Sequence, residues 1–280
     1  MYQIFFPARP LQPYIQVYWI VHGPTHQAAT IRENIFVDGQ ADIIFNFGCA
    51  YQRQYLNQSG KAESLAVSNL DAQRDYPVAI LQDGLIELVG VRFKPGGLGA
   101  FLSLPLHEIS NQTIELKLAF GEAGVELENR LFDSVGDPAK RMALLDEFFL
   151  GRLVLTSPFA FARYVADYIE ASFGTARMKQ VSSEVGYSIR TVDRLFRQFF
   201  GFSPKFYARI NRFQRALKLL SDDPQLDLTT LTLACGFYDQ SHLTREFTDF
   251  TGLPPSTYRL FLLEKAAAPP PNLVQFLQAE

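Results

Sequence analysis

The feature that most constrains the fold is a pattern that occurs twice in the C-terminal third of this 280-residue chain. Met178 to Lys205 and Leu228 to Pro255 each predict a short helix, a glycine turn and a longer helix with polar and basic residues on its outer face. A single helix-turn-helix pattern is a weak signal. Two in tandem suit successive major grooves on one side of a DNA duplex. The repeat therefore predicts a helical DNA-binding domain.

The longer helix of the first copy has two distinct faces. An apolar stripe at helical spacing predicts its buried side, and consists of Val192, Leu195, Phe196 and Phe199. Ser188 is placed to cap the N-terminus of this helix. Its outer face carries Arg190, Thr191, Asp193, Arg194 and Arg197. Arginine can donate two hydrogen bonds to guanine and aspartate can accept one from cytosine, so this face suits base reading. An ordinary solvated helix face is the alternative for this copy taken alone.

A third, longer helix is predicted to join the two copies. Ser203 as cap and Pro204 at the first helical position mark its start, and it runs to about Leu220. Lys205 and Arg209 lie outside its apolar stripe, and we expect them to contact phosphate. The alternative is that these cations only solvate the connecting helix.

The second copy repeats the arrangement with fewer charges. Asp227 and Asp239 are placed to cap its short and long helices, which are separated by a turn at Gly236. The N-terminal half of the long helix exposes Gln240, Ser241, Thr244 and Arg245. Glutamine suits adenine, and arginine suits guanine or phosphate. We therefore expect this helix to read a second major groove.

Charge is distributed unevenly along the chain. Residues 176–218 carry 10 Lys and Arg against 2 Asp and Glu, whereas residues 219–265 carry 3 against 7. Residues 1–157 are also acidic, with 12 basic residues against 17 acidic ones. A local positive excess is what a phosphate-binding surface requires. The first copy should therefore supply most of the salt-sensitive attraction to DNA.

The two copies resemble a known family. The stretch GFYDQSHLTREF at Gly236 to Phe247, followed by Gly252 to Arg259, is similar to the signature of AraC/XylS-type transcriptional regulators. Gly186 to Ser188 and Gly201 to Pro204 continue the resemblance into the first copy. It implies seven helices, arranged as two three-helix units joined by a long helix, with both recognition helices in adjacent major grooves. Ser182 and Thr232 replace a usual alanine; a small hydroxyl can bond to the backbone one turn earlier, so we expect the fold to tolerate both.

The N-terminal half predicts a different architecture. Residues 14–21, 41–47 and 85–93 are rich in β-branched and aromatic residues and predict strands, while Pro138 to Leu153 predicts an amphipathic helix. Asp38 to Phe47 and Val89 to Gly97 resemble a sensor-like domain found ahead of some AraC-type regulators, which implies a jelly-roll or cupin-like barrel. The predicted fold class is thus α+β. Its predicted parts are a regulatory domain at 1–155, a DNA-binding domain at 158–265 and a tail at 266–280.

A small-molecule effector is one expectation for the N-terminal half. An apolar pocket with a polar anchor could be lined by Tyr18, Trp19, Phe36, Asp42, Phe45 and Arg92. Aromatic residues on short strands are also what any β core contains, and that alternative stays open. A second alternative is that this half only dimerises or docks a partner protein, leaving a DNA-bound scaffold.

Several other classes of protein are disfavoured by the sequence. The four histidines have no metal-ligand spacing, and no nucleophile elbow or phosphate loop occurs, so we predict no enzyme, no metal and no cofactor. Cys49 and Cys235 should be free, buried thiols. No apolar run is long enough to span a bilayer, and we expect a cytoplasmic protein. The expected partners are double-stranded DNA, an effector, a second copy of the chain and RNA polymerase.

Overall fold

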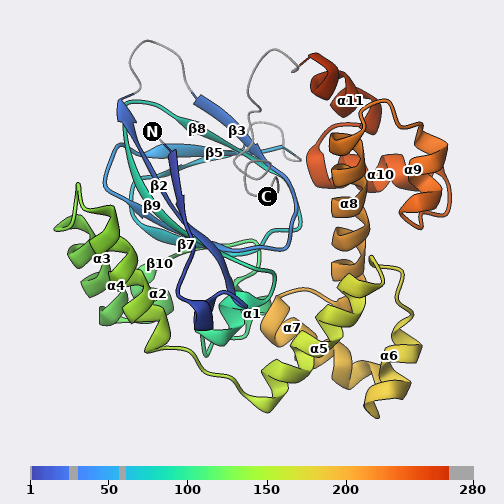
Figure 1. Ribbon diagram of the computed structural model, residues 1–280, viewed down its shortest axis with the longest axis horizontal. Coiled ribbons are helices and arrows are strands. Elements are labelled where there is room, and N and C mark those ends of the chain that lie inside the picture. The colour runs from blue at the N-terminus through green and yellow to red at the C-terminus, as the bar shows by residue number, and fades with distance from the viewer. Residues whose placement is uncertain (1, 25–30, 57–60, 265–280) are drawn as a thin grey trace.

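The structure is a computed structural model that describes residues 2–24, 31–56 and 61–264. A β-rich N-terminal half lies beside a helical C-terminal half, which confirms the predicted α+β class (Figure 1). The predicted tail at 266–280 lies outside the described residues. Within those residues, no helix is both long and apolar enough to cross a membrane.

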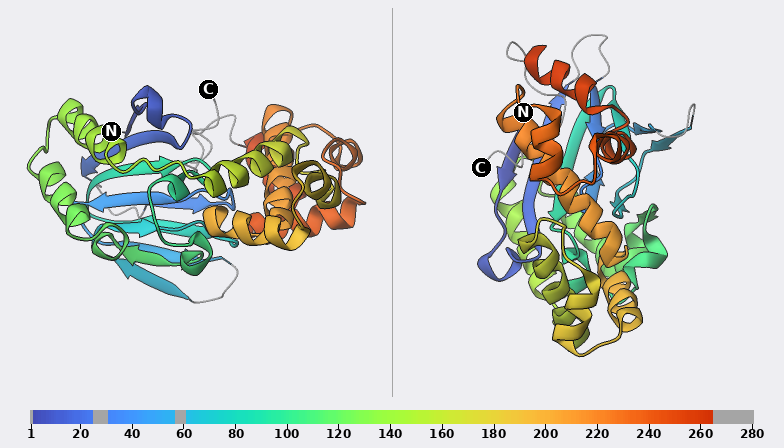
Figure 2. Two further views of the ribbon diagram at one scale, coloured as in Figure 1. Left: turned by 90° about the horizontal axis from the view of Figure 1, so that it is seen from below. Right: turned by 90° about the vertical axis from the view of Figure 1, so that its right-hand side faces the viewer.

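The N-terminal half contains two antiparallel sheets that face each other (Figures 1 and 2). One sheet has the order β1-β2-β9-β4-β7-β10 and the other β3-β8-β5-β6. Its strands are β1 (Tyr2–Phe5), β2 (Ile15–Pro24), β3 (Ile31–Ile35), β4 (Asp42–Asn46), β5 (Tyr51–Tyr55), β6 (Ala62–Leu65), β7 (Asn69–Asp71), β8 (Val78–Gln82), β9 (Leu85–Phe93) and β10 (Thr113–Glu115). The eight strands β2 to β9 have the order of a jelly roll, and β1 and β10 extend one sheet at its edges.

Helices cover the outer face of the larger sheet. They are α1 (Leu106–Ile109), α2 (Leu116–Phe120), α3 (Glu122–Phe132) and α4 (Pro138–Leu150). Tyr18 and Phe45 point to this side, where they pack in one core with Leu145 and Phe149 of α4. The Tyr18 hydroxyl donates to Asp146 Oδ1 at 3.0 Å, which fixes α4 on the sheet. The predicted helix at 138–153 is therefore present, three residues shorter at its C-terminal end.

The inner face of the same sheet looks toward the smaller sheet. Successive side chains of a strand alternate between faces, so Trp19 lies opposite to Tyr18. The Trp19 ring occupies the space where a side chain at Gly90 would stand, its direct cross-strand partner. Asp42 pairs in register with Arg92, two residues beyond Gly90 on the same face. Alternation thus gives the space between the sheets both an aromatic and a charged lining.

Seven helices form the C-terminal half, as the family resemblance implied. They are α5 (Ser157–Ala171), α6 (Met178–Val185), α7 (Ile189–Phe200), α8 (Pro204–Asp222), α9 (Leu228–Ala234), α10 (Gln240–Thr251) and α11 (Pro255–Glu264). Helices α5 to α7 and α9 to α11 form the first and second units, at opposite ends of α8 (Figure 1). The predicted caps are confirmed: Ser188, Ser203, Asp227 and Asp239 each accept a backbone N–H of the helix that follows.

The two hydroxyls that replace the usual alanine differ in their bonding. Thr232 Oγ1 donates to the Leu228 carbonyl one turn earlier at 2.6 Å, as predicted. Ser182 Oγ instead donates forward to the Tyr187 carbonyl at 2.5 Å, so the bond one turn earlier is not the one that this hydroxyl makes. Its bond closes the turn between α6 and α7, because the carbonyl there has no helical partner.

The two halves are joined by hydrogen bonds at both ends of their contact. Val37, in the loop after β3, donates its N–H to the Phe250 carbonyl at 3.1 Å and accepts the Gln214 side-chain amide at 2.7 Å. Ser110 Oγ, after α1, donates to the Gly201 carbonyl at 3.2 Å. The jelly roll therefore touches α10 and α8 at one end and the turn after α7 at the other.

The cysteines are only partly as predicted. Both are free, and Cys235 is fully buried in the core of the second unit. Cys49 was expected to be buried but is exposed. It follows Gly48 after the end of β4, where the chain leaves the sheet, so no apolar layer covers its thiol.

Candidate nucleic-acid interface and regulatory site

The second helix of each unit is held in the same way at its start. Ser188 Oγ accepts Thr191 N–H at 3.2 Å before α7, and Asp239 Oδ1 accepts His242 N–H at 2.7 Å before α10. Counted from these caps, Arg194 and Arg245 hold the same position, six residues into the helix. Both arginines are exposed. The two units thus present equivalent guanidinium groups on equivalent helical turns.

The outer face of α7 carries free and paired charges. Asp193 Oδ2 accepts Arg197 Nε at 2.7 Å, an i, i+4 ion pair along the helix. Arg190 and Arg194 are exposed, and neither has an ion-pair partner within the part of the chain that the structure describes. Thr191 shares a hydrogen bond with the Ser188 hydroxyl at 3.0 Å. Two unpaired guanidinium groups are therefore available to an anionic partner.

The outer face of α10 is polar with a single cation. Gln240 Nε2 donates to Thr229 Oγ1 of α9 at 2.7 Å, which orients its amide. Ser241, Thr244 and Arg245 are exposed. His242 is turned inward, where its Nε2 lies 3.1 Å from Glu246 Oε1. This face offers donors and acceptors but little net charge.

Lys205 and Arg209, both on α8, have different surroundings. Lys205 is exposed in the first turn of the helix. Arg209 Nε donates to Glu246 Oε1 at 2.7 Å, and its guanidinium stacks on the rings of Phe206 and Phe250. Its charge is thus engaged between α8 and α10, apart from the outer faces of α7 and α10.

Four exposed residues near these faces were missed in the sequence. Arg177 and Lys179 lie at the start of α6, and both are exposed cations. Tyr187 and Tyr238 occupy the residue before each cap, and Tyr238 is 92% exposed. Arg177 and Lys179 could have been found from the basic excess of residues 176–218. Tyr187 and Tyr238 could have been found by aligning the two caps, Ser188 and Asp239.

Helix α8 sets the separation of the two units. It has 19 residues, which corresponds to about 28 Å of helix length. Two major grooves on one side of B-DNA lie about 34 Å apart. Helix α8 is thus about 6 Å shorter than this groove spacing, so its length alone does not span two grooves.

The six residues expected to line an effector pocket are not brought together. Trp19, Asp42 and Arg92 lie on the inner face of the larger sheet. Tyr18 and Phe45 point to its other face, under the helices. The Phe36 ring meets Tyr258 of α11 edge-on at 6.0 Å, in the core of the second unit. Strand alternation and the contact between the halves therefore separate the set into three locations.

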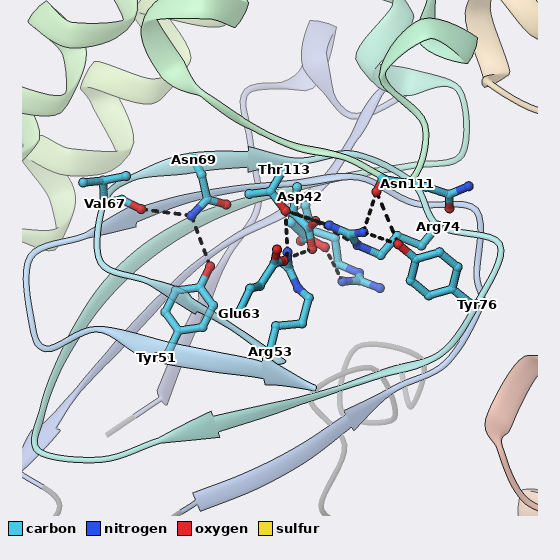
Figure 3. A network of polar contacts seen from close by, with 12 residues as sticks. Asp42, Tyr51, Arg53, Glu63, Val67, Asn69, Arg74, Tyr76, Asn111 and Thr113 are labelled. Atoms are coloured by element: carbon cyan, nitrogen blue, oxygen red, sulfur yellow. Dashed lines mark hydrogen bonds and ion pairs between the residues drawn. The ribbon is translucent and has the colours of Figure 1, made fainter. Parts of the chain in front are cut away.

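A network of charged side chains fills the space between the sheets (Figure 3). Arg53 of β5 is fully buried and forms ion pairs with Glu63 at 2.7 Å and Asp71 at 2.8 Å. Asp71 also pairs with Arg74 at 2.6 Å, and Arg74 donates to Thr113 Oγ1 at 2.7 Å. Neither Arg53 nor its partners were singled out in the sequence, because Arg53 stands between two glutamines and reads as an exposed position.

The second group in this space is built around Arg92. Its guanidinium pairs with Asp42 at 2.8 Å and with Asp38. Burial raises the pKa of Asp42 to about 6, although the Arg92 charge opposes the rise. Within the described residues, Asp42 Oδ1 and Trp19 Nε1 are buried without a hydrogen-bond partner. Buried polar atoms of this kind ordinarily hold water or a ligand.

Comparison with known proteins gives each half a family match. Residues 181–260 match a helix-turn-helix domain, and residues 3–115 match a domain of unknown function, DUF6597. The chain is also similar to a crystal structure described as a probable AraC family transcriptional regulator from Rhodopseudomonas palustris CGA009. The identity is 30%, over 37% of this chain and 97% of that chain, with a TM-score of 0.34. This chain belongs to the AraC family of transcriptional regulators.

Other similar solved structures are more distant in sequence. The C-terminal domain of AraT from Geobacillus stearothermophilus is 21% identical over 36% of this chain and 84% of that chain, with a TM-score of 0.34. ToxT from Vibrio cholerae is 9% identical over 88% of this chain and 98% of that chain, with a TM-score of 0.46. Members of the AraC family are transcriptional regulators and not enzymes, in agreement with the prediction from sequence.

Proposed function

We propose that this AraC family protein binds double-stranded DNA by inserting α7 and α10 into two adjacent major grooves. One observation carries the proposal: two capped helices at the ends of α8 each expose an arginine six residues after the cap, Arg194 and Arg245, and neither has an ion-pair partner among the residues that the structure describes. Arg190 and Arg194 would read bases or phosphate beneath the first unit, and Arg245, Ser241 and Thr244 beneath the second. Arg177, Lys179 and Lys205 would contact the phosphate backbone, and Thr191, Asp193, Arg197, Arg209 and Gln240 complete the proposed set.

Selection of bound sequences from random DNA tests this function. The full chain should recover a site of about 17 to 20 base pairs with two blocks about 10 base pairs apart. Arg194→Ala should weaken binding to that site by about 1 to 3 kcal/mol and relax its sequence preference under one block. Arg9→Ala, an exposed arginine on the jelly-roll half, is the matched control. Parent-like affinity and selectivity of Arg194→Ala would reject the placement of α7.

We further propose that residues 1–155 regulate the DNA-binding domain at 158–265 in response to a small-molecule effector. The charged space between the sheets supports this proposal, since it holds buried polar atoms without partners. Trp19, Asp42 and Arg92 face that space, as does Arg53. An effector would shift the protein only if it bound one arrangement of the two halves better than the other.

A scaffold without an effector is the alternative, in which the N-terminal half only dimerises or docks a partner. A thermal-shift screen of the full chain against polar metabolites separates the two. A ligand at 100 times its dissociation constant adds about 2.7 kcal/mol of stability. A screen without hits, together with dimerisation that depends on concentration, would favour the scaffold. Under either proposal we expect the protein to bind double-stranded DNA in the cytoplasm, with RNA polymerase as a further partner.

A further inference from the structure

A polar cleft separates the jelly roll from the helices that hold the DNA-binding units. It has a volume of about 370 Å³ and is open to solvent on one side. Asp38, Gln40 and Lys94 form its wall on the jelly roll, and Glu170 of α5 with Tyr207 and Asn211 of α8 form the opposite wall. The volume lies within the range of small-molecule sites. Of the residues named above in the space between the sheets, Asp38 alone also lines this cleft.

Most charges around the cleft already have partners. The Glu170 carboxylate accepts the Tyr207 hydroxyl at 2.6 Å and the Arg163 guanidinium at 3.1 Å. Asp38 is paired with Arg92, and its other oxygen accepts the Gln40 N–H at 2.9 Å. These carboxylates and guanidinium groups therefore neutralise one another within the protein.

Lys94 is the exception in this charge balance. Its backbone N–H donates to the Tyr14 carbonyl at 2.9 Å, which fixes the residue at the rim of the cleft. Within residues 2–24, 31–56 and 61–264, its ammonium has no carboxylate in ion-pair distance. Across the cleft, Asn211 Nδ2 is used by the Tyr207 carbonyl, which leaves its Oδ1 as an acceptor. One wall thus offers a cation and the other a neutral acceptor.

We propose that this cleft binds a small carboxylate that carries hydrogen-bond donors, such as a hydroxy acid or an amino acid. Its carboxylate would pair with the Lys94 ammonium, and its hydroxyl or ammonium group would donate to Asn211 Oδ1. The ligand would therefore be held by both halves of the chain at once. A charge-assisted hydrogen bond with Lys94 and a hydrogen bond donated to Asn211 Oδ1 are the two contacts that define this class.

The position of the cleft gives such a ligand a regulatory consequence, and only this consequence rests on the proposed function. Asn211 lies on α8, which joins the two DNA-binding units. A ligand that ties α8 to the jelly roll stabilises the arrangement described here relative to any arrangement in which the halves separate. DNA affinity would then change with ligand concentration, while ligand binding itself requires no DNA.

Calorimetric titration of the full chain tests the site. The probes are L-malate and D-gluconate as hydroxy acids, L-serine and L-glutamate as amino acids, and propionate and glycerol as controls that lack one of the two required groups. At least one hydroxy acid or amino acid should bind, and neither control should. Lys94→Met should weaken binding about 10-fold or more, and Asn211→Ala about 5-fold.

Matched variants make each outcome decisive. Lys140→Met removes an exposed lysine of α4 far from the cleft and should bind the probe as the parent does. No binding of any probe up to about 10 mM would overturn the proposal. A probe that is lost with Lys94→Met but kept with Asn211→Ala would also overturn it, because the site would then not bridge the halves. In the absence of ligand, Lys94→Met should bind DNA as the parent does. If the parent itself does not bind DNA, that result rejects the proposed DNA-binding function but leaves the ligand-binding test unaffected.

Discussion

At the scale of single residues, the interior of the jelly roll is distinguished by carboxylates that share buried arginines. Asp42 is the clearest case, because burial raises its pKa from 3.8 to about 6 despite the neighbouring Arg92. The folded chain therefore takes up a proton at Asp42 between about pH 4 and pH 6, where the unfolded chain does not. By linkage, this residue lowers the free energy of unfolding as pH rises through that interval.

Asp42→Asn tests this sign. The free energy of unfolding of the variant should lack the pH dependence that Asp42 contributes. The difference in this free energy, variant minus parent, should therefore rise between about pH 4 and pH 7. Urea unfolding at several pH values measures the difference. Asp83→Asn, at an exposed position, is the control. A constant difference between Asp42→Asn and the parent across this range would contradict the assignment.

The two thiols make a second prediction at this scale. Cys235 is fully buried, and burial raises its pKa to about 11. Cys49 is exposed. Because the thiolate is the reactive form, the Cys49 thiol of the native chain should react quickly with Ellman's reagent. The Cys235 thiol should react only in denaturant. Cys49→Ser should abolish the fast phase, and two fast equivalents in the parent would show that the second unit opens.

Residue-level features could be predicted from sequence where they depend on local chemistry. Ser188 and Asp239 were identified as caps because a cap needs only the next turn of helix. The effector residues were a different case, since alternation separates Tyr18 from Trp19 but does not say which face will be covered by helices. Arg53 was missed because its partners come from other strands.

At the scale of elements, the glycine turns that end helices differ in what surrounds them. Gly186 after α6 and Gly201 after α7 both have positive φ, 69° and 77°. A Cβ at Gly186 would meet no atom within 4 Å, whereas one at Gly201 would overlap the Gln73 amide and the Ser110 hydroxyl. The first turn is thus only a change of direction. The second turn also packs directly against Gln73 and Ser110 of the jelly-roll half.

This pair of turns provides an internally controlled prediction. Gly186→Ala should cost about 1 kcal/mol, the strain of a left-handed residue. Gly201→Ala should cost a further 1 to 3 kcal/mol, because the methyl group also displaces the Gln73 and Ser110 side chains. The midpoint of urea unfolding measures both. Equal shifts for the two variants would mean that the turn after α7 is not packed against the jelly roll.

Helices and strands were largely predictable because each depends on its own periodicity. Helix α8 and strand β9 have nearly the predicted bounds, since caps and turn residues mark their ends. The forward bond of Ser182 was not predictable in the same way. Its hydroxyl can reach two carbonyls, and the geometry of the α6–α7 turn decides between them.

At the scale of the whole molecule, the two DNA-binding units divide the electrostatic work unequally. The first unit and the start of α8 expose Arg177, Lys179, Arg190, Arg194 and Lys205. The second exposes Arg245 on α10, and Glu246 beside it engages Arg209. We expect the first unit to determine most of the salt dependence of DNA binding.

Paired variants test this division. Replacing Arg177 and Lys179 together by Gln should reduce the slope of log affinity against log salt by about 1 to 2 without changing the selected sequence. Arg245→Gln should reduce the slope by at most about 1 and relax preference under one block. Binding of the selected site at several salt concentrations measures both. An unchanged slope for the double variant would contradict the role of α6.

The contact between the halves was the part of the fold that the sequence did not predict. Phe36 was placed in the N-terminal pocket by its aromatic character, yet it packs in the core of the second unit. Periodicity describes how an element faces its own core, but it contains no information about a second domain. Docking depends on the shape of both surfaces, which exist only after each half has folded.

Val37 joins the halves through its peptide groups, since its N–H and its carbonyl each bond to the C-terminal half. The N–H bond to the Phe250 carbonyl does not depend on which side chain stands at 37, whereas the packing of Phe36 and Val37 in the core of the second unit does. A substitution scan of side chains would therefore report on that packing and on Gln214, but it would leave the bond between the Val37 N–H and the Phe250 carbonyl in place. Only a change to the backbone itself, such as proline at 37, would remove the N–H and expose how much the junction contributes.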